Sequence, residues 1–255
     1  MSNPRSKNEK LSILLRTLPS TPDHPGEAHR LAGFLSPAER ERAARFTFDR
    51  DRWAYSAAHS LLRRTLTEFY GLPPLAWQFS LNAYGRPELN PAHHGSQAAR
   101  FNISHTHGRV AVVTTLGITP DGVEVGVDTE GVERTPDVLG LARRFLSASE
   151  SDWLQALPAD DHQRQFLRLW TVKEAVAKAA GRGLSLGFQA FHCRFDPLSV
   201  QFDEAEWGTA DEWKLYNEWV EPAHWVSVAV RCPPGVAVEW QVEHLKPSNS
   251  ASVYP

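Results

Sequence analysis

The 255-residue sequence has few of the features that mark disulfide-rich, membrane-spanning, secreted or nucleic-acid-binding proteins. Its two cysteines, Cys193 and Cys232, are too few for a disulfide scaffold or a cysteine-rich zinc module. No run of about 18 apolar residues occurs, so we expect no membrane span. The first residues lack the apolar core of a signal peptide, so we expect a cytoplasmic protein. The formal net charge of −3 disfavours a nucleic-acid-binding domain, which would usually be basic.

Lysine is also scarce, and arginine supplies most of the positive charge. Lysine occurs six times among the 27 basic residues, so the other 21 are arginines. Seven of them lie between Arg40 and Arg64. The planar guanidinium group suits bidentate phosphate binding, which makes this segment a candidate phosphate site. Acidic residues are interleaved with these arginines, at Glu39, Glu41, Asp49 and Asp51. A solvated helix face is therefore the alternative.

What the sequence does contain is an ordinary globular composition and an internal repeat. Hydrophobic residues make up 42% and charged residues 22%, and the length allows one large domain or two small ones. The segment FLSPAE at 34–39 recurs as FLSASE at 145–150, which is 111 residues later. Each copy contains a serine followed three residues later by a glutamate, the pattern of a capping box. The pairs Ser36–Glu39 and Ser147–Glu150 therefore each predict the start of a helix.

A second helix and several strands are expected after each capping box. The helices are predicted over 53–70, which ends at Gly71, and over 162–180, which ends near Gly183. The expected strands are 101–104 and 109–116 in the first copy, and 188–195, 213–220 and 225–230 in the second.

This order predicts a pseudo-duplicated α+β protein with two lobes, each a small antiparallel sheet packed with helices. We place the lobes at 11–118 and 119–246, joined in the turn-rich segment 117–122. The polar tails 1–10 and 247–255 are expected to be disordered.

Two acids follow the join on a predicted strand over 123–130. Asp128 and Glu130 share one face of this strand, and their Cα atoms should lie about 6.5–7 Å apart. Both carboxylates could then reach one hard cation. The alternative is an exposed strand end with two solvated acids.

A third acid lies on the second predicted helix, where Glu174 and Lys178 are four residues apart. One interpretation is a surface ion pair that contributes about 0.3–0.5 kcal/mol. The other makes Glu174 a metal ligand or base, with Lys178 facing a phosphate or leaving group. Ser104 and His105 next to Asp128 do not predict a Ser-His-Asp triad, because adjacent strand residues point to opposite faces.

Taken together, these segments resemble the Sfp-type 4′-phosphopantetheinyl transferases over about residues 25–235. The matching motifs are YGRP at 84–87, FNISH at 101–105, GVDxE at 126–130, WTVKEAxxK at 170–178 and GRGL at 181–184. The resemblance implies transfer of 4′-phosphopantetheine from coenzyme A to a serine of an apo acyl or peptidyl carrier protein, with release of 3′,5′-ADP. It also implies the corresponding fold, a role in secondary metabolite biosynthesis and a monomer, since both lobes are in one chain.

The resemblance also assigns roles to residues. Asp128, Glu130 and Glu174 map onto the acids that bind Mg²⁺ in the family, and Glu174 is also the implied base for the serine hydroxyl. Lys178 would stabilise the departing phosphate. The C-terminal lobe would thus carry the metal-binding acids and the catalytic helix.

Coenzyme A would bind mainly to the N-terminal lobe. Arg86, Ser104 and His105 map onto residues that hold coenzyme A phosphates in relatives, and Lys173 is expected to add to them. Arg52, on the arginine-rich helix, is placed at the 3′-phosphate. Two further candidates compete for that position, His59 and Arg63.

Two other functions remain open from the residues alone. One is a Mg²⁺-dependent nucleotide or pyrophosphate hydrolase that uses the same acids. The other is a non-catalytic module that binds coenzyme A or a carrier protein. In all three cases we expect no nucleic acid and no membrane as partner.

Overall fold

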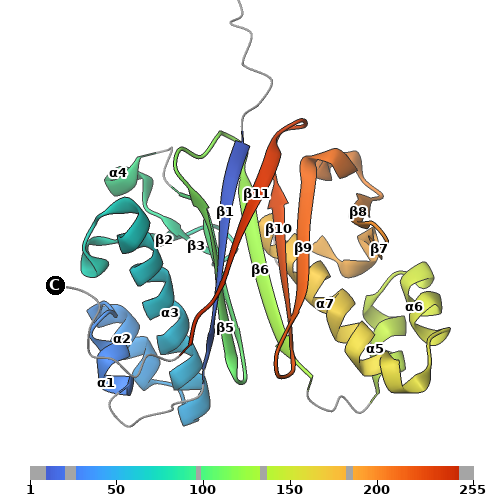
Figure 1. Ribbon diagram of the computed structural model, residues 1–255, viewed down its shortest axis with the longest axis horizontal. Coiled ribbons are helices and arrows are strands. Elements are labelled where there is room, and N and C mark those ends of the chain that lie inside the picture. Colours follow the sequence, from blue (N-terminus) through green and yellow to red (C-terminus); the bar gives the residue numbers. More distant parts are fainter. Residues whose placement is uncertain (1–9, 21–26, 96–98, 133–136, 182–185, 247–255) are drawn as a thin grey trace, which may run out of the picture.

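The computed structural model describes residues 10–20, 27–95, 99–132, 137–181 and 186–246. Two sheets stand side by side in the middle of the molecule, with helices on the outer side of each (Figure 1). In spatial order, the first sheet contains β11 (Ala237–His244), β1 (Lys10–Pro19), β5 (Arg109–Leu116) and β4 (Phe101–Thr106). The second contains β6 (Glu124–Gly131), β10 (His224–Arg231) and β9 (Trp213–Val220). The predicted α+β architecture with two lobes is confirmed.

The helices and the smaller hairpins repeat a similar plan on the two sides. The N-terminal side contains α1 (Glu27–Ala32), α2 (Pro37–Ala44), α3 (Asp49–Tyr70), β2 (Phe79–Leu81), β3 (Pro87–Leu89) and α4 (Pro91–His94). The C-terminal side contains α5 (Val138–Phe145), α6 (Ala148–Gln155), α7 (His162–Ala179), β7 (Phe191–Phe195) and β8 (Leu198–Phe202). Short 3₁₀ turns connect some of these elements, and one of them, Phe188–Ala190, replaces the start of a predicted strand.

Local signals in the sequence account for the helix ends. Both predicted capping boxes form, so Ser36 and Ser147 each accept a hydrogen bond from the backbone N–H of the glutamate three residues later. Helix α3 ends at Gly71, whose φ of +80° is a left-handed conformation that glycine adopts readily. Gly183, the predicted end of the second long helix, lies outside the described residues.

The last strand corrects the predicted division into lobes. Residues 237–244 were assigned to the C-terminal lobe, but β11 pairs in parallel with β1, in register from Lys10 opposite Ala237 to Thr17 opposite His244. Ion pairs cross the same two strands, with Arg16 Nε 2.8 Å from Glu243 Oε2. The C-terminal strand therefore completes the N-terminal sheet. Sequence patterns report local periodicity and contain no information on pairing between strands more than 200 residues apart.

Three apolar cores hold these layers together. One lies between α3 and the first sheet, and one packs α7 against the aromatic residues of the C-terminal side. The third joins the two sheets to each other, through side chains that include Ile13, Val113, Val125 and Val228. Because both sheets contribute to this third core, the two lobes share buried apolar surface. Within the described parts of the chain, no helix is long and apolar enough to cross a membrane.

Candidate active site

The predicted site residues of both lobes meet where β4, β6 and α7 come together. The Ser104 hydroxyl on β4 donates to Asp128 Oδ1 on β6, at 2.8 Å. The Lys178 ammonium on α7 donates to the same carboxylate oxygen at 2.7 Å, and to Ser104 Oγ at 3.1 Å. Ser104 and Asp128 are buried, whereas the Lys178 side chain is 26% exposed. A strand of one sheet, a strand of the other and one helix thus converge on a single carboxylate.

Asn102, which the sequence patterns did not single out, helps to join the two sheets at this point. Its side-chain Oδ1 accepts a hydrogen bond of 3.1 Å from the backbone N–H of Val127. The Lys178 ammonium also donates to the Val127 carbonyl, at 3.1 Å. The N–H and the carbonyl of Val127, the residue before Asp128, are therefore both held by side chains from other elements. This network restricts where the Asp128 carboxylate can point.

Gly126 sets the distance between β6 and α7. A Cβ atom placed on Gly126 would lie 2.1 Å from the Ala175 carbonyl oxygen and 2.5 Å from the Ala179 nitrogen. Such distances are far below van der Waals contact, so the helix could not approach this closely if any other residue stood there. The close approach is what lets Lys178 reach Asp128.

The three predicted metal ligands lie in a region that disfavours negative charge. Burial, and secondly the charge of Asp128, raises the pKa of Glu130 to about 7. The pKa of Glu174 is also raised, by burial and then by Asp128, while Lys178 acts in the opposite direction. Glu130 accepts one hydrogen bond of 3.3 Å from the Thr106 hydroxyl. The three carboxyls are therefore close enough to perturb each other electrostatically.

The fit of this region to a metal ion is partial. The donors are carboxylate oxygens, which suit a hard cation such as Mg²⁺, and Asp128 Oδ2 is buried without a hydrogen-bond partner. However, across the residues that the structure describes, no three histidine, cysteine or carboxylate side chains are arranged to hold a metal ion. The chemistry of the donors fits Mg²⁺, but the ligand set is not preformed.

Lys178 does not form the surface ion pair that its spacing from Glu174 allowed. Its ammonium binds Asp128 and the Val127 carbonyl on the neighbouring strand, so the functional interpretation of Lys178 is favoured over the simple helix-surface pair.

Arg86 and His105 lie next to this cluster. Arg86 donates to Glu88 at 2.9 Å, to Glu124 at 2.5 Å and to the Lys178 carbonyl at 3.0 Å, so it links the β2–β3 hairpin to the end of α7. The pKa of His105 is lowered by desolvation and then by the positive charges of Lys178 and His59. The neutral form of His105 is therefore favoured at this position.

Arg52 and its two competitors for the 3′-phosphate differ in accessibility. Arg52 is 44% exposed and pairs with Asp49 at 2.7 Å. Arg63 is buried, and its Nε donates to Glu39 Oε2 at 2.8 Å. His59 Nδ1 lies 3.1 Å from the other oxygen of Glu39. The proposal of Arg63 as a phosphate-binding residue is therefore wrong, because its guanidinium is already held by buried partners.

The assignment of Lys173 to coenzyme A is also wrong. Its side chain has no exposed surface, and its ammonium donates to the carbonyls of Phe188 at 2.7 Å and Phe191 at 2.6 Å. It also lies 2.9 Å from Glu150 Oε2. Successive residues of a helix point about 100° apart, so Lys173 faces the C-terminal core while Glu174 lies close enough to Asp128 for its charge to raise the Glu174 pKa.

These two corrections reveal a buried ion pair in each lobe. Glu39 and Glu150, the glutamates of the two capping boxes, bind Arg63 and Lys173 of the following long helices. The 110-residue separation of the two basic residues nearly matches the 111-residue separation of the glutamates. That repeated spacing is a sequence signal that relates the two pairs, but it does not show that the partners are in contact or buried.

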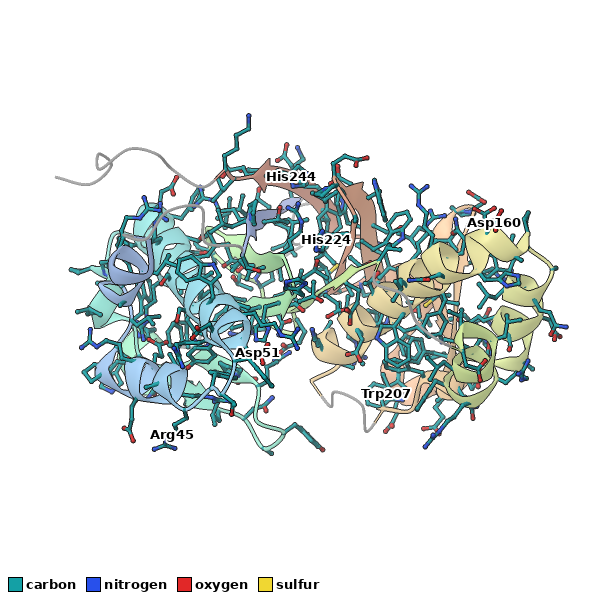
Figure 2. All side chains as sticks on the ribbon, turned by 90° about the horizontal axis from the view of Figure 1, so that it is seen from below. Arg45, Asp51, Asp160, Trp207, His224 and His244 are labelled. Atoms are coloured by element: carbon teal, nitrogen blue, oxygen red, sulfur yellow. The ribbon has the colours of Figure 1, made fainter. Side chains whose placement is uncertain are left out.

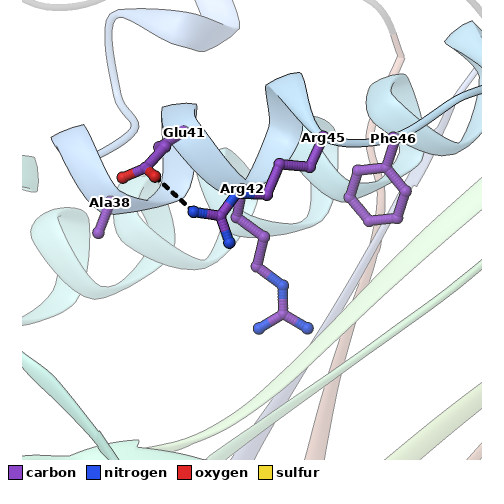
Figure 3. Close-up of a pocket in the computed structure, with 5 residues that line it drawn as sticks. All are labelled: Ala38, Glu41, Arg42, Arg45 and Phe46. Carbon is purple, nitrogen blue, oxygen red and sulfur yellow. Dashed lines mark hydrogen bonds and ion pairs between the residues drawn. The ribbon is translucent and has the colours of Figure 1, made fainter.

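Arginine residues also line a cavity on α2. Its volume is about 570 Å³, and it is lined by Ala38, Glu41, Arg42, Arg45 and Phe46 (Figure 3). Arg45 pairs with Glu41 at 2.5 Å, and the Arg42 guanidinium lies over the Tyr55 ring, 5.6 Å from its centroid. Figure 2 shows Arg45 on the N-terminal side, His224 near the junction of the lobes, and Asp160 and Trp207 on the C-terminal side.

Comparison with known proteins connects this arrangement to one family. A family model described as 4′-phosphopantetheinyl transferase superfamily matches residues 124–229. Another, described as 4′-phosphopantetheinyl transferase, N-terminal, matches residues 23–117. A 4′-phosphopantetheinyl transferase of Bacillus subtilis is 34% identical over 169 residues, which cover 66% of this chain and 70% of the relative. The chain belongs to the 4′-phosphopantetheinyl transferase family.

Other relatives have similar names. The 4′-phosphopantetheinyl transferase HetI of Nostoc sp. is 33% identical over 155 residues, covering 61% of this chain and 63% of that protein. A crystal structure of the Thermotoga maritima holo-[acyl-carrier-protein] synthase matches with a TM-score of 0.36 and 21% identity, covering 43% of this chain and 62% of that one.

The two matched segments of this transferase correspond to the two lobes. The first contains Arg52, Arg86, Ser104 and His105, and the second contains the three acids and Lys178. Strands β1 and β11 lie outside both matched segments, although they pair with each other.

Proposed function

We propose that the protein transfers 4′-phosphopantetheine from coenzyme A to a serine hydroxyl of an apo acyl or peptidyl carrier protein in a Mg²⁺-dependent reaction that releases 3′,5′-ADP. The observation that carries the proposal is the cluster of Ser104, Asp128 and Lys178 at the meeting point of the lobes, in a chain of this family. The Lys178 ammonium can stabilise the leaving phosphate. A nearby carboxylate whose pKa is raised can accept the proton of the attacking serine.

Glu174 is the proposed base. Burial raises its pKa, so the carboxylate is a stronger proton acceptor than a solvated glutamate and can take the proton of the carrier serine. Lys178, 26% exposed on the next turn, contributes fixed positive charge to the departing phosphate. These roles place proton removal and charge stabilisation on one face of α7.

Mg²⁺ is the proposed metal, and Asp128, Glu130 and Glu174 are the residues that would hold it. When bound, it supplies positive charge that neutralises the pyrophosphate of coenzyme A. The unpartnered Oδ2 of Asp128 and the raised pKa of Glu130 support this assignment, because a nearby cation would stabilise both groups in their charged forms.

Coenzyme A is the proposed co-substrate, bound through its phosphates by Arg52, Arg86, Ser104 and His105. The cavity on α2 adds Arg42 to the accessible basic groups of the same lobe. The apolar core that both sheets share supports a monomer in which the two lobes of one chain pack against each other. We place the reaction in the cytoplasm and expect neither nucleic acid nor membrane as a partner.

The deciding experiment combines the purified protein, Mg²⁺, coenzyme A and an apo carrier domain. Intact mass spectrometry should show the addition of one phosphopantetheine group, and a carrier with its acceptor serine changed to alanine should remain unmodified. Omission of Mg²⁺ together with addition of EDTA should stop the reaction. Hydrolysis of coenzyme A without carrier modification would instead support a nucleotide or pyrophosphate hydrolase. Binding without any turnover would support a binding module.

A further inference from the structure

A second cavity lies in the C-terminal lobe, between α6, α7 and the β7–β8 hairpin. Its volume is about 510 Å³, within the range of small-molecule sites. Its lining residue Arg168 lies on α7 six positions before Glu174, so the two side chains leave that helix in directions about 120° apart. Its lining includes Ser149, Glu150, Trp153, Arg168, Arg194, Phe195 and Asp196.

Arg168 is held in this cavity by two aromatic rings and one hydrogen bond. Its guanidinium lies between two rings, 4.0 Å from the Phe195 centroid and 5.2 Å from the Trp225 centroid. Its Nε donates to Asn217 Oδ1 at 2.9 Å. Its two terminal amino groups have no hydrogen-bond partner among the described residues, and neither is a buried atom. Four N–H donors of a positioned guanidinium are therefore available to a ligand.

The charges around Arg168 leave its positive charge only partly compensated. Burial lowers the pKa of Arg168, and the charge of Asp196 opposes this effect. Glu150, the other acid of the lining, is neutralised by Lys173 at 2.9 Å. The remaining charged groups of the lining are Arg168, Arg194 and Asp196, and their charges add up to one positive charge. Such a site suits a ligand with a single negative charge better than a doubly charged phosphate.

The remaining walls are aromatic. The rings of Trp153 and Phe195 lie with their centroids 5.6 Å apart, and both side chains line the cavity. A guanidinium that is stacked on a ring presents its donors at its edge, in the plane that matches a carboxylate. Aromatic walls beside such an edge suit a flat apolar body attached to that carboxylate.

We infer that this cavity binds a small planar monocarboxylate, with Arg168 holding the carboxylate and the rings of Trp153 and Phe195 contacting the apolar body. This site is separate from the coenzyme A and carrier-protein functions proposed above. It predicts a ligand that binds without occupying the Asp128 cluster.

Benzoate is a suitable probe, with calorimetric titration of the full chain as the measurement. Benzoate should bind, whereas the neutral isostere benzamide and the cation benzylamine should bind at least tenfold more weakly. Inorganic phosphate is the fourth probe, and binding of phosphate in preference to benzoate would overturn the inferred ligand class. A wild-type protein that does not bind benzoate would overturn the inference.

Arg168→Met tests the anion-binding group, because methionine keeps much of the contact with both rings and removes the donors. The variant should bind benzoate at least tenfold more weakly and should modify a carrier protein at the wild-type rate. Arg231→Met is the matched control, since Arg231 also lies over a ring of this lobe, that of Trp213 at 5.9 Å, outside this cavity. Equal benzoate affinity of Arg168→Met and the wild type would contradict the inference.

A second variant keeps Arg168 in place. Ser149 lines the cavity and is exposed, so Ser149→Phe should fill part of the cavity without disturbing the core. It should weaken benzoate binding at least tenfold. Unchanged binding to a folded Ser149→Phe protein would overturn the proposed position of the ligand, even if Arg168→Met failed to fold.

Discussion

Gly126→Ala should separate α7, which carries the proposed base Glu174, from β6, which carries two of the proposed metal ligands. The added Cβ would lie 2.1 Å from the Ala175 carbonyl oxygen, a backbone atom that cannot rotate away. Ordinary contact begins near 3.4 Å, so α7 and β6 must move apart by about 1.3 Å. Lys178 Nζ is 2.7 Å from Asp128 Oδ1, so a movement of this size breaks their hydrogen bond.

The expected costs follow from this displacement. Insertion of a methyl group into a packed contact destabilises a protein by about 1–3 kcal/mol. A misplacement of about 1 Å in catalytic groups lowers activity by about 10²-fold. We therefore expect the rate of carrier modification to fall about 100-fold, while most of the protein stays folded at room temperature.

The assay compares initial rates of carrier modification with unfolding in urea for the same preparations. Gly131→Ala is the control on the same strand, because its Cβ would meet the side chain of His224 at 3.2 Å and the His107 carbonyl oxygen at 3.6 Å, with no backbone atom as close as at Gly126. That variant should retain most of the activity. If folded Gly126→Ala protein transfers phosphopantetheine within twofold of the wild-type rate, the close approach of α7 is not what aligns the site.

Three further predictions concern the acids and the buried ion pairs. Asp128→Ala or Glu174→Gln should abolish carrier modification while the circular dichroism spectrum is retained, because each removes an oxygen ligand or base. Arg63→Met should destabilise the fold and reduce the loss of stability on acidification between about pH 4.5 and 2. The pKa of Glu39 is lowered from 4.5 to about 2 by its hydrogen bonds with His59 and Arg63, against the effect of burial, so its charged form stabilises the fold above this range by up to about 3 kcal/mol. Lys173→Met should cost about 3–5 kcal/mol in urea unfolding, because it leaves Glu150 buried without its cation.

Each of these predictions has an outcome that contradicts it. Near-normal turnover by either acid variant would refute the metal and base assignments. An unchanged acid-unfolding profile of Arg63→Met would show that Glu39 does not depend on this arginine. A Lys173→Met protein as stable as Lys246→Met, an exposed surface control, would show that the buried pair contributes little.

Several elements, and the placement of Asp128 and Glu130 on one strand face, could be predicted from local patterns. The capping boxes at Ser36 and Ser147 and the end of α3 at Gly71 depend on residues within one helical turn, and all three form. The alternation that put Asp128 and Glu130 on one face of a strand is also local. Ser104 and Thr106 of β4 donate to these two acids in turn, which agrees with that shared face.

The errors have a common origin in contacts between distant segments. Lys173 was assigned to coenzyme A by its place in a motif, but the direction of its side chain depends on which face of α7 packs into the core. Arg63 was one of seven arginines in a basic segment, and its burial depends on Glu39 and on the carbonyls of Pro74 and Trp77. The composition of the arginine-rich segment does not reveal these partners of Arg63.

The sequence by itself determined the helix ends, the duplicated order of elements, the family resemblance and the choice of three acids as candidate metal ligands. These properties depend on short-range hydrogen bonding, on periodicity and on motifs, all of which lie within a few residues of one another. The tertiary structure alone decided that β11 joins β1, that Lys178 binds Asp128, and that Lys173 and Arg63 are buried. Those outcomes depend on which apolar surfaces pack together across the chain, because packing determines the environment of each charged side chain.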